Sequence, residues 1–250
     1  MKRLTRLFPV VALLAVTSVS GAGPGSAASG GPAVPRSARV GALFSGGLAG
    51  GHFCTASVVR SRGRDLILTA AHCLSGGGDG GGASGVVFVP GYRGGRAPYG
   101  VWRVTKAFVP GAWRERADED SDFAFAVVAS DSASKGGREL EDVVGANAFA
   151  AGRVTGASAV VVTGYPNVLD APLSCTNRPT AHSRTQQRIE CPHFTDGTSG
   201  SPWVDVEGDV VGVLGGFEQG GATDDVSYSA VLGSAAADLY REAGGISRAA

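Results

Sequence analysis

Short apolar runs recur along most of the chain, some continuous and some alternating with polar positions. The runs are rich in β-branched residues and too short for amphipathic helices, so they favour strands. Glycine, proline and acidic residues gather between the runs and supply turn chemistry. The predicted strands cover residues 55–59, 66–68, 86–89, 101–109, 123–128, 159–163, 204–214 and 226–232. Many short strands separated by such turns indicate an all-β barrel or sandwich.

The pattern changes in three places. Near the C-terminus, residues 235–242 favour a short helix, with Ser234 predicted as its N-cap and glycines at 244–245 as its end. The glycine-rich tract at 76–85 predicts a surface loop. Residues 131–147 are polar and lack a strand pattern, which suits a connection between two halves of the fold.

The N-terminus has the composition of a secretory signal peptide. Basic residues at 2, 3 and 6 precede an apolar run over 7–19, and small residues follow at 26–28. A membrane anchor is the alternative, but this run is interrupted by Pro9 and falls short of the roughly 20 apolar residues that a bilayer requires. Residues 1–28 are therefore predicted to be a signal peptide, which makes the mature protein secreted and extracellular. Residues 29–39 would then form a short propeptide ending at Arg39.

Charge excludes some partners. Five of the 22 basic residues and none of the 22 acidic residues lie within positions 1–39, so the remaining chain has a net charge of about −5. A mildly acidic domain lacks the basic surface patch that would bind nucleic acids or anionic membranes. We expect a monomer that binds neither of them.

Four cysteines remain in this exported chain, and disulfides are their expected state. Pairing Cys54 with Cys73 and Cys175 with Cys191 is one of three possible connectivities. It would close two loops of fewer than 20 residues, each contributing roughly 3 kcal/mol in the chain-entropy model. A zinc site is the alternative, but the close C-x₂₋₄-C ligand spacing is absent from the sequence, so no metal is predicted.

Three segments carry candidate chemistry. His72 stands at the end of a predicted strand, Asp122 opens another, and Ser199 lies in the glycine-rich turn 197–202. A serine hydroxyl becomes a good nucleophile when a nearby histidine takes its proton. A buried carboxylate then orients that imidazole and stabilises its cation. These residue types predict an acyl-transfer triad that needs no cofactor.

The segments TAAHC at 69–73, DFAF at 122–125 and GTSGSP at 197–202 resemble those of the chymotrypsin-like (trypsin-like) serine peptidases, in particular their secreted bacterial members. The resemblance extends over about 40–232. The order His, Asp, Ser along the chain agrees with that family, whereas α/β-hydrolases run Ser, Asp, His and subtilisins run Asp, His, Ser. Chain order thus disfavours both rival folds.

The resemblance implies an all-β fold of two antiparallel six-stranded β-barrels of chymotrypsin type, with a short C-terminal helix. The N-terminal barrel would span 40–130 and carry His72 and Asp122. Residues 131–150 would connect the barrels, and 151–250 would form the second barrel with Ser199 and the helix. The implied activity is that of a serine endopeptidase acting on protein or peptide substrates.

The resemblance also assigns roles around the scissile bond. The backbone N–H groups of Gly197 and Ser199 would form the oxyanion hole, and Gly197 permits the close approach this requires. Substrate would add as an extended strand along residues 214–216. One departure concerns activation, because trypsin-type zymogens place an aspartate before the serine to pair with the freed N-terminus. Here Thr198 stands in that place and cannot form the ion pair, so activation by that switch is not expected.

Specificity is predicted from the pocket positions. Where enzymes selective for lysine or arginine place an acidic residue, this chain has His193, and bulky Phe217 and Val226 stand where open pockets have glycine. A shallow pocket would favour a small apolar P1 side chain, whereas His193 meeting an acidic P1 residue is the alternative, as in glutamyl endopeptidases. The complete predicted pocket comprises His193, Phe194, Leu214, Gly215, Gly216, Phe217 and Val226.

Other interpretations remain open. Acidic residues at 118–120 lie close to Asp122 and could instead belong to a calcium site, although they look like a solvated loop. The remaining histidines, His52, His182 and His193, have the default expectation of structural or exposed residues. A catalytically silent binding module on the same fold and a secreted esterase are the competing functions.

Overall fold

The computed structural model describes residues 34–75, 83–130 and 137–245. The predicted signal peptide, residues 29–33 of the predicted propeptide, residues 76–82 of the glycine tract and residues 131–136 of the predicted connection lie outside the described residues. Within the described ranges, no helix is long and apolar enough to cross a membrane.

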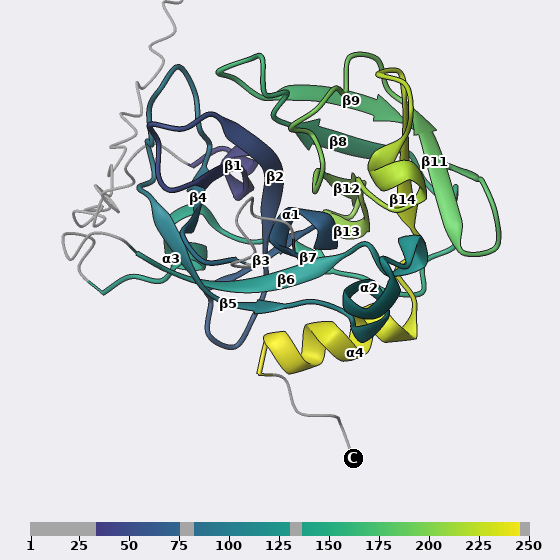
Figure 1. Cartoon of the computed structure of the whole chain (residues 1–250), viewed down its shortest axis with the longest axis horizontal. Coiled ribbons are helices and arrows are strands. Elements are labelled where there is room, and N and C mark those ends of the chain that lie inside the picture. Colours follow the sequence, from purple (N-terminus) through teal and green to yellow (C-terminus); the bar gives the residue numbers. More distant parts are fainter. Residues whose placement is uncertain (1–33, 76–82, 131–136, 246–250) are drawn as a thin grey trace, which may run out of the picture. The chain divides into compact units, whose positions relative to one another are not determined.

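Six antiparallel strands of the N-terminal half close into a barrel in the order β1-β2-β3-β6-β5-β4 (Figure 1). Strand β5 alternates, with Trp102 and Val104 buried and Arg103 and Thr105 exposed, as a strand with one solvated face should. Strands β2, β3 and β4 are buried on both faces, which explains the continuous apolar runs of β3 and β4. The strands are β1 (Val40–Ser45), β2 (His52–Val59), β3 (Leu66–Thr69), β4 (Val86–Pro90), β5 (Trp102–Phe108) and β6 (Ala124–Ser130).

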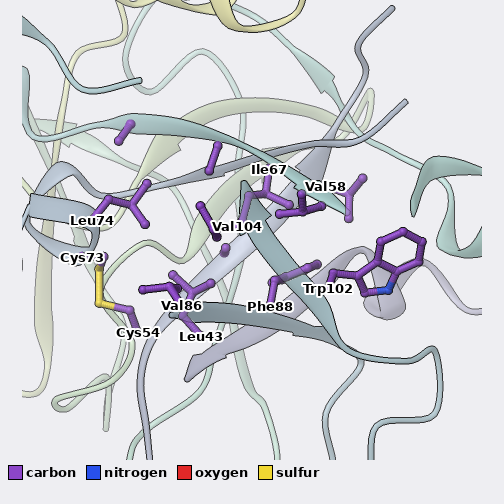
Figure 2. Packing of buried hydrophobic residues seen from close by; sticks show 14 of the residues in the cluster. Leu43, Cys54, Val58, Ile67, Cys73, Leu74, Val86, Phe88, Trp102 and Val104 are labelled. Atoms are coloured by element: carbon purple, nitrogen blue, oxygen red, sulfur yellow. A yellow bond between two sulfur atoms is a disulfide. The ribbon is translucent and has the colours of Figure 1, made fainter. Parts of the chain in front are cut away.

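Apolar side chains fill this barrel. Leu43, Ile67, Phe88 and Trp102, which Figure 2 labels, belong to one buried cluster and come from four different strands. All four are at most 1 % exposed, so each contributes roughly 1.5–3 kcal/mol by burial. The barrel is thus a packed scaffold, and functional side chains must stand at its rim.

The C-terminal half is also β-structured, which agrees with the expected fold class, but its hydrogen bonding differs in detail from a second closed six-stranded barrel. One sheet has five strands in the order β7-β13-β12-β8-β9, with β7 parallel to β13, and the other has the order β10-β11-β14. The strands are β7 (Ala148–Phe149), β8 (Val160–Gly164), β9 (Leu173–Asn177), β10 (Thr180–Ala181), β11 (Gln186–Glu190), β12 (Pro202–Asp205), β13 (Asp209–Val213) and β14 (Val226–Ala230).

The two sheets separate because the ladder between β13 and β14 is interrupted. The N–H of Val213 donates to the side-chain hydroxyl of Ser229 at 3.0 Å. One backbone bond, from the Gly215 N–H to the Tyr228 carbonyl, follows at 3.0 Å. The chain then turns at Gly216, whose φ of 76° is left-handed, into the 3₁₀ segment η4 (Phe217–Gly220).

Short helices punctuate the strands: η1 (Arg36–Arg39), α1 (Ala71–Ser75), α2 (Gly111–Arg116), η2 (Glu119–Ser121), α3 (Leu140–Val144) and α4 (Ser234–Ala243). Helix α4 is the one predicted from sequence. It ends before Gly244 as expected, but its N-cap is Gly233, because Ser234 already lies in the first turn and makes no side-chain cap. Its Tyr240 packs on the rings of Phe125 and Phe149.

Each predicted strand has a counterpart, and the predicted run over 204–214 divides into parts of β12 and β13 at a turn. The sequence pattern missed β1, β7 and β9–β11. Strand β11 is instructive because Gln186 and Gln187 are only 4 % and 3 % exposed. Their buried amides hydrogen-bond to other elements, so a polar run conceals a buried strand.

Two disulfides are present, Cys54–Cys73 and Cys175–Cys191. This is one of the three connectivities that the sequence left open. The first joins β2 to α1 inside the barrel (Figure 2), and the second joins β9 to the residue after β11. The first disulfide therefore joins a strand to a helix, and the second links the two sheets of the C-terminal half.

Candidate active site

His72 lies where β3 gives way to α1, and Cys73 beside it is tied to β2 through Cys54. The imidazole Nδ1 lies 2.8 Å from Oδ2 of Asp122, and the His72 backbone N–H donates to Oδ1 of the same carboxylate at 3.0 Å. A carboxylate only accepts, so in the neutral ring the proton is on Nδ1. His72 Nε2 is then unprotonated and able to act as a base.

Asp122 is completely buried and follows η2. Besides the two His72 donors, the N–H of Gly216 donates to Oδ2 at 2.9 Å. A Cβ on Gly215 would lie 2.8 Å from that oxygen, so this position has no room for a side chain. The carboxylate is satisfied by three N–H groups, as a buried charge requires.

Ser199 stands in a turn that is bonded on both sides. Gly197 and Gly200 have φ values of 93° and 85°, which other residues rarely adopt. The Thr55 N–H of β2 donates to the Ser199 carbonyl at 2.7 Å, and the Thr55 hydroxyl donates to the Gly197 carbonyl at 3.0 Å. The Gly200 N–H donates to the Leu214 carbonyl. The turn is therefore fixed to the N-terminal barrel and to its own half of the fold.

Two N–H groups of this turn lack acceptors. Within the ranges that the structure describes, neither Gly197 nor Ser199 donates its backbone N–H to another group. The Thr198 N–H between them donates to the Thr195 carbonyl at 3.1 Å. The arrangement leaves two donors available for an anionic oxygen.

His72 and Ser199 line one cavity of about 560 Å³. In the described part of the chain, no hydrogen bond joins Ser199 Oγ to the imidazole, which is common in catalytic sites without substrate. A second cavity, of about 670 Å³ around Tyr99 and Tyr165, contains neither residue. The cavity that His72 and Ser199 share, here called the catalytic cavity because it holds the candidate site, is lined by Ser45, Gly51, His52, Phe53, Cys54, His72, Cys73, Asn167, Asp196, Gly197, Ser199, Glu218, Gln219 and Gly221.

The seven predicted pocket residues lie outside that lining. Phe194 and Leu214 are buried with Cys191 and Trp203, and Gly215 and Gly216 pack against Asp122 and Gln186. His193 is exposed with a φ of 66°, and its N–H donates to Asp225. Phe217 stacks on the rings of His182 and Tyr228 at 4.8 and 5.0 Å, and Val226 is half-buried in β14.

Sequence reasoning missed several cavity residues. Asp196 could have been found from its position three residues before Ser199, and Glu218 and Gln219 from their place just after the predicted pocket wall. His52 was expected to be structural or exposed; it is 5 % exposed, packs against Phe44 and Tyr165, and also lines the cavity. Asn167 has no local signal, because a long-range fold contact brings it there.

Cys54, His72 and Cys73 approach closely enough to suggest a metal site, since their ligand atoms lie within 4.8 Å of one another. The two sulfurs are joined in the disulfide, however. A disulfide sulfur is not the thiolate that zinc requires. The two cysteines therefore belong to the barrel packing, and the cluster offers no thiolate ligand for zinc.

Comparison with known proteins agrees with this geometry. A search of curated proteins finds no match. Among solved structures, the protease Anisep from Arthrobacter nicotinovorans is 27 % identical with a TM-score of 0.70, covering 83 % of this chain and 95 % of its own. The thermostable serine protease AL20 from an extremophilic microorganism is 29 % identical with a TM-score of 0.72, covering 85 % of this chain and 100 % of its own.

A Glu endopeptidase shares the fold at 17 % identity and a TM-score of 0.67, covering 85 % of this chain and 93 % of its own. The model of the trypsin-like peptidase domain matches residues 54–213, a stretch that includes His72, Asp122 and Ser199. Together with the serine protease neighbours, this match supports a serine endopeptidase. The chain belongs to the family of trypsin-like peptidase domains.

Proposed function

We propose that this protein is a secreted serine endopeptidase that cleaves peptide bonds through an acyl-enzyme, with Ser199, His72 and Asp122 as its catalytic triad. The observation that carries the proposal is the buried Asp122 carboxylate, which accepts both N–H groups of His72 while His72 and Ser199 line one cavity. That bonding pattern leaves Nε2 as the free base of a histidine that shares its cavity with Ser199.

In the first half of the reaction, Ser199 Oγ attacks the scissile carbonyl carbon while His72 Nε2 takes the hydroxyl proton. The carbonyl oxygen becomes an oxyanion and accepts hydrogen bonds from the Gly197 and Ser199 N–H groups. His72 then gives the proton to the departing amine, and the acyl group stays on Ser199. Asp122 stabilises the imidazolium throughout.

In the second half, water takes the place of the amine. His72 Nε2 removes a proton from the water as its oxygen attacks the acyl carbon. The Ser199 C–O bond breaks, and the serine recovers its proton from His72. His72 carries out every proton transfer while Asp122 orients its ring and stabilises its cation, so the proposal includes no cofactor.

For the P1 side chain we propose a preference for small apolar residues. Phe217 stacks on Tyr228, and a Cβ on Gly221 would lie 2.5 Å from the Val226 carbonyl oxygen, so the segments that carry the predicted pocket walls Phe217 and Val226 are closely packed. Glutamyl specificity through His193 is the alternative, and the similarity to a Glu endopeptidase extends to the fold alone. Profiling cleavage of a peptide library decides between them, since enrichment of Glu at P1 would overturn the small-apolar preference.

We further propose that residues 1–28 direct export and are removed. The two disulfides suit an oxidising compartment. The domain organisation we propose is a barrel over 40–130, a connection over 131–150 and a second β-domain over 151–250. Mass spectrometry of the protein recovered from culture medium would locate the mature N-terminus.

The competing function is a catalytically silent binding module. An organophosphonate probe distinguishes the two, because it forms a covalent bond only with an activated serine. We expect stoichiometric labelling of the purified protein and its loss in Ser199→Ala. Ser201→Ala, two residues away in the same turn, should retain labelling. Absence of labelling in a folded wild-type protein would support the binding module.

A further inference from the structure

Gln186 joins three elements that meet behind the proposed triad. It lies in β11, is 4 % exposed and has no part in the proposed chemistry. Its Nε2 donates to the Glu119 carbonyl at 3.0 Å and to the Asp120 carboxylate at 2.8 Å, and its Oε1 accepts the N–H of Phe217 at 3.2 Å. Both donors and one acceptor position of the buried amide are thus in use.

The groups that Gln186 holds are neighbours of functional ones. The Glu119 carbonyl also accepts the N–H of Asp122, at 3.3 Å. On the other side, Phe217 follows Gly216, whose N–H donates to the Asp122 carboxylate. Gln186 therefore spans the loop that carries Asp122 and the segment along which substrate would pair.

Glu119 adds a second connection between the same two segments. Its Oε1 accepts the N–H of Glu218 at 2.9 Å. Glu218 and Gln219 have φ values of 49° and 54°, a left-handed conformation that non-glycine residues keep only when their surroundings hold it. Both residues line the catalytic cavity, so this strained backbone is part of the cavity wall.

Gly216 shows that this contact is tight. A Cβ there would overlap the Gln186 side-chain oxygen and would lie 2.9 Å from the backbone nitrogen of Ala230. The glycine lets the Gln186 amide lie directly against the backbone. The amide thereby limits how far residues 216–218 can move from Asp122.

We propose that Gln186 and Glu119 are positioning residues for this peptidase, which hold the substrate-binding segment 214–216, through the adjoining residues Phe217 and Glu218, in register with the Asp122 loop. The proposal rests on the proposed function and identifies the residues that set its affinity for extended peptides. Asp122 is held by its own bonds to His72 and Gly216. Removing the Gln186 hydrogen bonds should therefore loosen the substrate-binding segment more than it moves Asp122. The binding of P2 and P3 residues should suffer more than the bond-breaking step.

The test compares an extended tetrapeptide amide with a single-residue ester that has the same P1 side chain. Gln186→Met keeps the length of the side chain but removes its hydrogen bonds. We expect kcat/KM for the tetrapeptide to fall about 10- to 100-fold, mainly through KM, because misplacement of a binding group is costly. Turnover of the ester, which lacks the P2 and P3 residues that would pair along 214–216, should change less than about threefold.

Gln187→Met is the matched control, since Gln187 is the next residue of β11, equally buried, and bonded to Val211 and Thr155 on the other side of the strand. Gln187→Met should lower thermal stability and leave the ratio of kcat/KM for the peptide to kcat/KM for the ester unchanged.

A second pair of variants, at Glu119, does not depend on substituting a buried residue. Glu119 is exposed, and Glu119→Ala should raise KM for the peptide, whereas Glu119→Gln, which still offers an oxygen to Glu218, should restore it.

The outcomes separate two kinds of failure. If wild-type protein turns over both substrates and Ser199→Ala does not, but the ratio is unchanged in Gln186→Met and Glu119→Ala, the positioning role is wrong and the peptidase stands. An equal ratio change in Gln187→Met would likewise overturn it. If Gln186→Met fails to fold, the Glu119→Ala and Glu119→Gln pair decides. No Ser199-dependent turnover in the wild type overturns the proposed function and the positioning role with it.

Discussion

At the scale of single residues, the buried carboxylate of Asp122 organises the site. It accepts N–H groups from His72 and Gly216, which lie 50 and 94 positions away in the sequence. Each of these bonds is charge-assisted, and such bonds are roughly twice as strong as neutral ones. These bonds offset the free-energy cost of burying the Asp122 carboxylate, which would be large without partners. The bond to Nδ1 also fixes the His72 tautomer that has its proton on Nδ1.

Asp122→Asn should leave the fold intact and lower kcat about 10⁴-fold, the loss typical when the carboxylate of such a triad is replaced by an amide. The amide can offer an N–H to His72 Nδ1, which favours the tautomer with a proton on Nε2 and removes the base. Steady-state kinetics on a peptide amide would measure the loss. Asp118→Asn is the control, since Asp118 accepts the Ser121 hydroxyl on the same loop, and a comparable loss there would contradict the assignment of Asp122.

At the scale of elements, the two disulfides differ in what they adjoin. Cys54 and Cys73 both line the catalytic cavity, and Cys73 follows His72 directly. Cys175 and Cys191 pack with Val162, Ile189 and Trp203 in the core of the other half. Both close loops of similar length, with sequence separations of 19 and 16, so their entropic contributions should be alike while their effects on activity should not.

Replacing either cysteine pair with alanine should reduce the free energy of unfolding by about 3 kcal/mol, as loops of this length predict. Loss of Cys54–Cys73 should also reduce kcat/KM about 10²-fold, because His72 would lose a fixed neighbour. Loss of Cys175–Cys191 should spare kcat/KM at temperatures where the protein stays folded. Urea titrations and kinetics on the two double variants provide the comparison, and equal losses of activity would contradict it.

At the scale of the whole molecule, the start of the described chain is integrated into the fold. Arg39 donates to the Asn147 side chain at 3.1 Å, and burial lowers the pKa of its guanidinium. Val40 is 4 % exposed, pairs with Ser57, and accepts the N–H of Gly91. The Arg39–Val40 bond therefore lies inside the folded structure, which does not favour it as a cleavage site.

A form that begins at residue 29 should accordingly be as active as one that begins at Val40. Thr198, which stands before the serine, donates its hydroxyl to the Thr195 carbonyl at 2.7 Å, so the turn is satisfied without a free N-terminus. Activity of the two forms, with intact mass before and after the assay, checks this. An extended form that is inert until trimmed at Val40 would refute it.

Alkaline pH should destabilise the protein through its buried tyrosines. Burial raises the pKa of Tyr165 above its ordinary value of 10.0, and the pKa values of Tyr92 and Tyr240 are raised for the same first cause. The native state then keeps phenol protons that the unfolded chain releases, so this contribution is complete below pH 10 and declines as pH rises. The decline is at most about 1.4 kcal/mol per pH unit for each tyrosine.

Urea titrations between pH 8 and pH 11.5 measure that decline. Tyr165→Phe should flatten it, since phenylalanine has no proton to lose and, among the described residues, the Tyr165 hydroxyl makes only a long contact of 3.5 Å to the Val40 carbonyl. Tyr99→Phe, at a half-buried position, serves as the comparison. If the free energy of unfolding of Tyr165→Phe declined with pH as steeply as that of the wild type, the alkaline destabilisation would not arise from Tyr165.

The sequence by itself determined five of the six strands of the N-terminal barrel, β2 to β6, together with helix α4 and the residue types of the proposed triad. These features depend on local patterns: β-branched runs, turn glycines, and the motifs around His72, Asp122 and Ser199. Local patterns can be predicted from sequence because their physical causes, backbone conformation and the burial of one face, act within a few residues.

Only the tertiary structure decided which cysteines pair, how the β13–β14 ladder is interrupted, and which side chains line the cavity. Asn167, Glu218 and His52 reach the cavity from three separate segments, and β11 is buried through amides that find partners far along the chain. Such features depend on contacts between residues distant in sequence. A single sequence contains both partners of each contact, but nothing local in it records which groups meet, so the fold has to bring them together first.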